Sequence, residues 1–222
     1  MTLELYKTIV DISTWLTAIA LVLSLYKFPL RSPEVKVQAL GFFLHVVNMV
    51  ITEIVAPRGT DVNIPMNIAI HYLVLTPLFM YHVAWKYRYR MLTMVSVVVY
   101  CIFALWNFLY GQQESFNSNT VALGALLIVI HSVLYFYYLL VNLPVQKLQR
   151  LPMFWFNTAY LAYYGSTLFI FGAYVVEVFR DSLMLYWTIK NFLTIGHYIL
   201  IIVGLCQDLR NIRSPSSLPS AP

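Results

Sequence analysis

The fold is decided by residues 91–142, which read MLTMVSVVVYCIFALWNFLY at 91–110, GQQESFNS at 111–118 and NTVALGALLIVIHSVLYFYYLLVN at 119–142. Neither long block contains an Asp, Glu, Lys or Arg, and the run between them is polar. An α-helix rises 1.5 Å per residue, so each block is long enough to cross about 30 Å of hydrocarbon. The stretch therefore predicts two transmembrane helices joined by a short turn.

The rest of the chain repeats this pattern. Hydrophobic residues make up 60% of the 222 residues and charged residues 10%, against about 25% charged in an average soluble domain. Apolar blocks separated by proline or polar breaks predict an all-α, polytopic membrane protein, a bundle of seven transmembrane helices in one domain over 1–205. The expected spans are 8–26, 37–56, 66–85, 91–110, 119–142, 153–176 and 183–205. Residues 206–222, rich in Ser and Pro, are expected to form a disordered cytoplasmic tail.

The distribution of Lys and Arg predicts the orientation. Cytoplasmic loops are enriched in these residues. One side of the predicted bundle carries ten of them, Lys27, Arg31, Lys36, Lys86, Arg88, Arg90, Lys147, Arg150, Arg210 and Arg213, and the other carries Lys7, Arg58 and Arg180. We therefore expect the N-terminus outside the cell and the C-terminus in the cytoplasm. The net charge of +5 is explained by this topology, because basic cytoplasmic loops contact anionic lipid headgroups. We therefore expect a lipid bilayer as partner and no nucleic acid.

Ionisable residues within the spans are candidates for a functional site, because an unpaired charge in hydrocarbon is costly. One group is predicted in the outer half of the bundle, within about 5–12 Å of the outer span ends. Lys190 is the expected counter-ion of Glu53 or Asp11 there. Aromatic side chains would supply the walls of a pocket open to the outside. The predicted ligand-binding residues are Asp11, Glu53, His71, Asn107, Tyr164, Trp187, Lys190 and Asn191.

A second group consists of three histidines at a deeper level, about 12–17 Å from the inner span ends. His45, His131 and His197 come from three different spans. Three imidazoles at one level are a candidate zinc site, and two of them are candidate axial ligands of a haem iron. The sequence contains no H-x-x-x-H, H-E-x-x-H or C-x-x-C pair that would reinforce this hypothesis.

Several strings in residues 40–205 carry a resemblance to a known family. They are Thr52-Glu53, Asn67…His71-Tyr72…Thr76-Pro77, Ser132…Tyr135-Phe136, Phe154-Trp155, Tyr163-Tyr164-Gly165-Ser166-Thr167-Leu168-Phe169, Trp187-Thr188-Ile189 and Gly204. The chain resembles uncharacterised seven-helix bacterial membrane proteins that are often found near two-component signalling genes. A His is frequent in that family where Lys190 stands here. The resemblance implies a compact seven-helix fold in a bacterial inner membrane and a signalling context, and it implies no catalytic activity. Because the predicted spans leave no room for a cytoplasmic domain, we expect a sensor of this kind to signal through a membrane or cytoplasmic partner.

Three functions follow as hypotheses. The first is a small-ligand-binding sensor or receptor-like subunit with an outward-facing polar pocket. The alternative is an intramembrane metal- or haem-dependent enzyme or redox protein that uses His45, His131 and His197. The third is a proton-coupled transporter in which Glu53 and Lys190 exchange protons, although no repeat or broken segment typical of transporters is evident.

Overall fold

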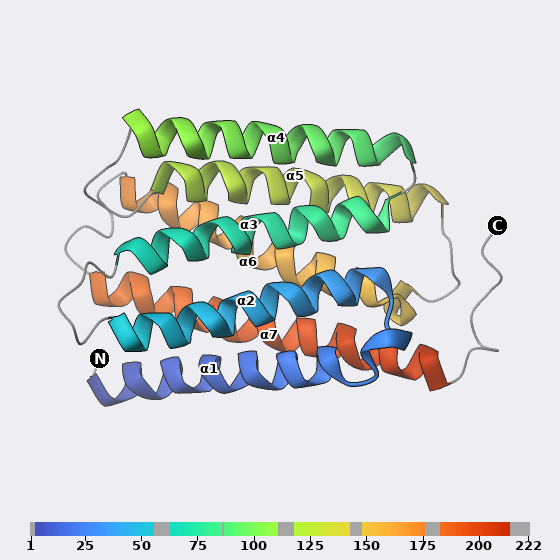
Figure 1. The fold of residues 1–222 in the computed structure, drawn as a ribbon, viewed down its shortest axis with the longest axis horizontal. Coiled ribbons are helices and arrows are strands. Elements are labelled where there is room, and N and C mark those ends of the chain that lie inside the picture. Colours follow the sequence, from blue (N-terminus) through green and yellow to red (C-terminus); the bar gives the residue numbers. More distant parts are fainter. Residues whose placement is uncertain are drawn as a thin grey trace.

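The structure is a computed structural model, and it describes residues 3–55, 63–85, 87–110, 118–142, 148–175 and 183–213. Inside these ranges, the side chains at 3, 5–6, 53, 55, 63–68, 87–88, 118, 170–175 and 183–187 are not described, which includes those of Glu53 and Trp187. The described residues form seven α-helices and no β-strand, and the helices run side by side along the long axis (Figure 1). The prediction of an all-α fold is confirmed.

The helices match the expected spans closely. They are α1 (Leu3–Leu25), α2 (Pro33–Val55), α3 (Asn63–Ala84), α4 (Tyr87–Tyr110), α5 (Ser118–Asn142), α6 (Pro152–Val175) and α7 (Leu183–Arg213), with short 3-10 helices η1 (Phe28–Leu30) and η3 (Leu148–Arg150). Proline stands at the first position of α2 and of α6, where its missing N–H leaves no helical hydrogen bond unmade.

The seventh helix is longer than predicted. It continues to Arg213, so residues 206–213 are helical and do not belong to a disordered tail. The reason is a tertiary contact: Asp208 is buried and forms an ion pair of 3.0 Å with Arg31. One turn later, Asn211 donates a hydrogen bond to the Arg150 carbonyl. The predicted tail beyond this point, 214–222, lies outside the described residues.

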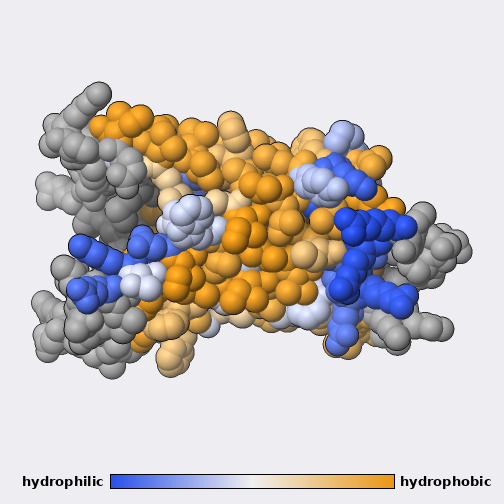
Figure 2. Space-filling view, turned by 90° about the horizontal axis from the view of Figure 1, so that it is seen from below, coloured by the Kyte–Doolittle hydropathy of each residue, from blue (hydrophilic) through white to orange (hydrophobic). Residues whose placement is uncertain are grey.

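The surface of the bundle is apolar along most of its length. In the described residues, five segments are long and apolar enough to cross a membrane, namely Lys7–Leu25, Pro33–Thr52, Tyr89–Tyr110, Asn119–Asn142 and Thr188–Arg213. Large apolar side chains such as Trp15, Val95 and Ile102 are more than half exposed. The face in Figure 2 shows hydrophobic residues in the middle and hydrophilic residues near both ends. These features fit a multi-pass membrane protein.

The helices close into a ring. Each helix packs against the next one in the chain, α1 also packs against α7, and α3 reaches across to α5. Glycines allow some of these close approaches: a Cβ on Gly124 of α5 would lie 2.4 Å from Val74 of α3, and one on Gly204 of α7 would lie 2.6 Å from Phe156 of α6. Small residues at helix contacts are typical of membrane bundles, where backbone proximity supplies the packing energy.

A buried hydrogen-bond network joins α3, α5 and α6. The Tyr81 hydroxyl donates to Asn157 Oδ1 at 2.5 Å and lies 2.6 Å from Ser132 Oγ, while Asn157 Nδ2 donates to the Ser132 carbonyl at 3.1 Å. Because the Tyr81 proton goes to Asn157, Ser132 must be the donor in its contact with Tyr81. The three side chains therefore satisfy one another and fix the position of α3 relative to α5 and α6.

Candidate functional site

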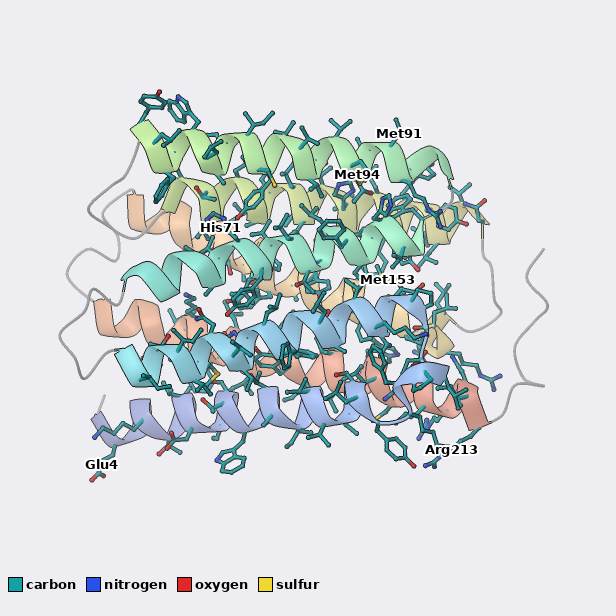
Figure 3. The ribbon with its side chains drawn as sticks, viewed as in Figure 1. Glu4, His71, Met91, Met94, Met153 and Arg213 are labelled. Atoms are coloured by element: carbon teal, nitrogen blue, oxygen red, sulfur yellow. The ribbon has the colours of Figure 1, made fainter. Side chains whose placement is uncertain are left out.

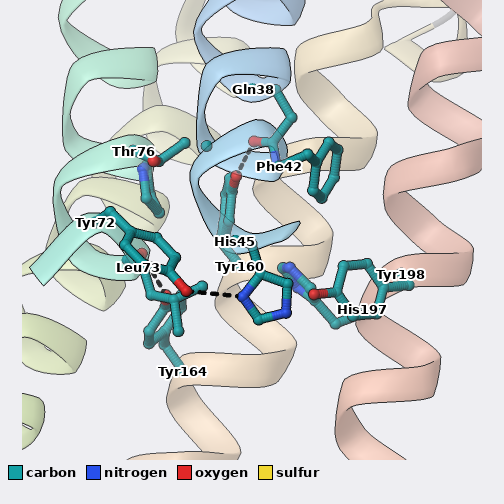
Figure 4. Close-up of a pocket in the computed structure, with 12 residues that line it drawn as sticks. Gln38, Phe42, His45, Tyr72, Leu73, Thr76, Tyr160, Tyr164, His197 and Tyr198 are labelled. Atoms are coloured by element: carbon teal, nitrogen blue, oxygen red, sulfur yellow. Dashed lines mark hydrogen bonds between the residues drawn. The ribbon is translucent and has the colours of Figure 1, made fainter. Parts of the chain in front are cut away.

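A cavity in the middle of the bundle gathers polar side chains from four helices. We call it the central cavity (Figure 4). It has about 30 Å³ of space for water, enough for roughly two water-sized groups. Its lining is Gln38, Gly41, Phe42 and His45 from α2, Tyr72, Leu73, Thr76 and Pro77 from α3, Tyr160 and Tyr164 from α6, and His197 and Tyr198 from α7.

One wall of the central cavity is a His–Tyr pair that joins α2 to α3. His45 Nδ1 and the Tyr72 hydroxyl form a hydrogen bond of 2.9 Å (Figure 4). The two rings meet edge to face, with centroids 6.0 Å apart. Either group can be the donor, because imidazole and phenol each combine an acceptor with a donor. An occupant of the cavity can therefore either donate a hydrogen bond to this pair or accept one from it.

The opposite wall comes from α6 and α7. His197 Nδ1 lies 3.2 Å from the Ala159 carbonyl, and since a carbonyl accepts only, Nδ1 carries the proton of the neutral ring. Nε2 is then the acceptor atom of the His197 ring. On α6, the Tyr160 hydroxyl donates to Gln38 Oε1 of α2. On this side of the cavity, the Ala159 carbonyl fixes the tautomer of His197, and the bond to Gln38 fixes Tyr160 as a donor.

A proline inside α3, Pro77, also lines the central cavity. Pro77 has no N–H, so the carbonyl of Leu73, four residues earlier, has no helical donor. The Tyr164 hydroxyl of α6 donates to that carbonyl at 2.7 Å. A proline inside a membrane helix is tolerated where a neighbouring helix supplies the missing bond. Tyr164 therefore has a structural role at the cavity as well as forming part of its wall.

The lining contains no Asp, Glu, Lys or Arg. Burial of an ion without a counter-charge is costly. The central cavity is therefore suited to water or to a small neutral molecule that both donates and accepts hydrogen bonds.

The structure does not bring the three predicted metal-ligand histidines together. His45 and His197 line the central cavity, whereas His131 of α5 contacts Ser96 of α4 at 3.0 Å and stacks on Tyr81. Within the described ranges, no group of three or more His, Cys, Asp or Glu side chains could hold a metal ion. The sequence predicts that the three histidines lie at one depth in the bundle. It does not predict that the His131 side chain of α5 faces α4, away from the central cavity.

The predicted outer cluster is only partly described. Asp11 is exposed, so its carboxylate does not face the bundle interior as expected, because the face of α1 that carries it is turned outward. His71 is hydrogen-bonded to Tyr100 of α4 at 3.2 Å.

The other members of that cluster lie in several places. Asn107 donates to Thr120 at 3.3 Å, and Tyr164 lines the central cavity. Lys190 and Asn191 are partly buried on α7. The side chains of Glu53 and Trp187 lie outside the described residues, so the Glu53–Lys190 pair stays a prediction.

Sequence reasoning missed Gln38, Tyr72 and Thr76 as cavity residues. Two signals point to them in retrospect. Gln38 precedes His45 by seven residues, two helical turns on the same face of α2, and Pro77 marks the level at which α3 needs a hydroxyl donor from a neighbour.

Comparisons of the chain with protein-family models, with curated proteins and with solved structures find no match, so the geometry of the site carries the functional argument.

Proposed function

We propose that the chain is a membrane sensor or receptor-like subunit whose central cavity binds a small neutral polar molecule. In this proposal the seven helices all cross the bilayer, with the N-terminus outside and the C-terminus in the cytoplasm. The observation that carries it is the convergence of hydrogen-bonding side chains from α2, α3, α6 and α7 on one uncharged cavity.

The cavity's position supports a sensor. An occupant that bonds to His45 Nδ1 in place of Tyr72 competes with the hydrogen bond that joins α2 to α3. Pro77 also lines this cavity and interrupts the backbone hydrogen bonds of α3, and the Leu73 carbonyl left without a helical donor is bonded by Tyr164 of α6. Occupancy can therefore alter how α3 packs against two neighbours, provided the ligand binds the two arrangements with different affinity.

The resemblance to seven-helix proteins near two-component signalling genes adds a context to the proposal. In that context the chain passes its state to a membrane or cytoplasmic signalling partner. Location in a bacterial inner membrane belongs to the same proposal.

A binding experiment on purified protein tests the site. The probes are methanol, formamide and urea at sub-denaturing concentrations, and the readout is the near-ultraviolet absorption of the buried tyrosines. At least one probe is expected to give a saturable change. His45→Phe and Tyr72→Phe are expected to weaken that response about tenfold or more, because each removes a hydrogen-bonding group from the cavity wall.

His71→Phe is the matched control. It breaks a His–Tyr hydrogen bond with the same ring geometry, centroids 6.0 Å apart at 66°, and does not line the central cavity. Its response should equal that of the wild type. A folded wild-type protein without a saturable response to any of the three probes would overturn the proposal, as would an equal loss in the control.

A further inference from the structure

A second and larger cavity lies at the end of the bundle where α1 leads into α2. We call it the end pocket. It is about 470 Å³, within the range of sites for small organic ligands. Its walls come from the start of α2, from α5, from the start of α6 and from the end of α7. Met153, which lines it, and Arg213 lie toward this end of the molecule in Figure 3, and Glu4 lies at the opposite end.

Four of the five N–H donors of the arginine in this pocket already have acceptors within the protein. Arg31 Nε donates to the Tyr26 carbonyl at 3.0 Å, and Nη1 donates to the Leu205 carbonyl and to Asp208 Oδ2, each at 3.0 Å. Nη2 donates to the Leu23 carbonyl. The Arg31 side chain is completely buried. These bonds tie α1 to α7 and leave the guanidinium neutralised, so the end pocket is not built to hold an anion.

Glu34 supplies the remaining charge. It lies in the first turn of α2, is partly buried and lines the pocket. No hydrogen bond or ion pair joins its carboxylate to another residue in the part of the chain that the structure describes. Since Arg31 and Asp208 cancel, Glu34 leaves the lining with one net negative charge. A cationic group is the natural counter-charge.

The other walls suit an ammonium group on an apolar body. Tyr135 is buried within an aromatic cluster, with its ring centroid 5.9 Å from that of Trp85 and 6.3 Å from that of Tyr138. The phenol oxygen of Tyr135, which lines the pocket, can accept a hydrogen bond from an ammonium group. The rest of the lining is mostly apolar, namely Leu30, Leu151, Pro152, Met153 and Ile212, with the polar side chains of Ser32 and Asn211.

We infer that the end pocket binds an organic ammonium compound, with the cationic head at Glu34 and Tyr135 and the hydrocarbon body against the apolar walls. This site is separate from the central cavity and does not rest on the function proposed for it. Two sources offer the same chemistry: a soluble aliphatic amine, and the headgroup of an aminolipid such as phosphatidylethanolamine.

Calorimetric titration of hexylammonium into the full chain in dodecyl maltoside micelles tests the inference. Saturable binding is expected. Hexanol and hexanoate, which keep the chain length and change the charge, are expected to bind at least tenfold more weakly. Glu34→Gln should weaken hexylammonium binding by about tenfold or more, because it removes the counter-charge while preserving the side-chain shape.

Glu4→Gln is the matched control, since it makes the same substitution at an exposed carboxylate at the opposite end of the molecule. It should bind hexylammonium like the wild type. Binding of hexanol as tight as that of hexylammonium would overturn the inference. So would unchanged binding in a folded Glu34→Gln variant, or no binding at all.

A titration in the presence of lipid distinguishes a soluble amine from an aminolipid headgroup as the natural ligand. Phosphatidylethanolamine or phosphatidylglycerol is added to the micelles before the titration. If phosphatidylethanolamine displaces hexylammonium and phosphatidylglycerol does not, the pocket binds an aminolipid headgroup. This displacement should be absent in Glu34→Gln. Hexylammonium binding that neither lipid displaces assigns the pocket to a soluble amine.

Discussion

The Leu73 carbonyl shows how a single residue can tie two helices together. Pro77 removes its helical donor, and the Tyr164 hydroxyl of α6 replaces it at 2.7 Å. An unpaired carbonyl in an apolar interior costs free energy, so the tyrosine hydroxyl is needed as long as the proline is present.

A double-mutant cycle tests this dependence. Tyr164→Phe is expected to lower the free energy of unfolding by about 1 kcal/mol, since it leaves the Leu73 carbonyl without a donor. In a Pro77→Ala background residue 77 regains its N–H, so the same substitution should cost much less. Reversible unfolding in mixed detergent micelles gives the four stabilities. Equal losses in both backgrounds would show that the hydroxyl has no link to the proline.

At the scale of elements, the contact between α2 and α3 sets the width of the central cavity. A Cβ on Gly41 would lie 2.5 Å from Thr76 Cγ2 and 2.6 Å from Thr76 Oγ1. Both residues line the cavity, so the helices approach each other as closely as a glycine allows.

Gly41→Ala is therefore expected to push α3 away from α2 and to destabilise the protein by about 1–3 kcal/mol. Gly196→Ala is the matched control, because a Cβ there meets nothing within 4 Å. It should be neutral or stabilising by up to about 1 kcal/mol through helix propensity. Unfolding in mixed micelles measures both. A Gly41→Ala protein as stable as the wild type would mean that Thr76 can move aside freely.

At the scale of the whole molecule, the question is how the ring of helices lies in the bilayer. The basic residues predict that the turn at 111–118 is outside and the loop at 143–147 is inside. Alkaline phosphatase, which is active only outside the bacterial inner membrane, reports the side.

Phosphatase fused after residue 115 is expected to be active, and fusions after residue 145 and after the last residue are expected to be inactive. A green fluorescent protein fused at the same points should give the opposite pattern. If both reporters show the inverse pattern, the orientation is wrong. If positions 115 and 145 lie on the same side, α5 does not cross the membrane.

The helices and most of their ends could be predicted from the sequence alone. An apolar block of about 20 residues between prolines or polar residues is a local property, and hydrocarbon permits few structures other than a helix in such a block. The end of α7 was missed because residues 206–213 are held by Arg31 and Arg150, which are distant in the chain.

Which polar side chains meet depends on the packing of the folded bundle and could not be predicted from the sequence. His45 and His71 each find a tyrosine with the same geometry, yet one lines the central cavity and the other does not. Helical period identifies the residues that share a face. It does not determine how far each helix is rotated about its axis or which neighbour that face meets. Those quantities depend on packing of the whole ring, and for this reason Asp11 was misplaced and the three histidines were grouped together.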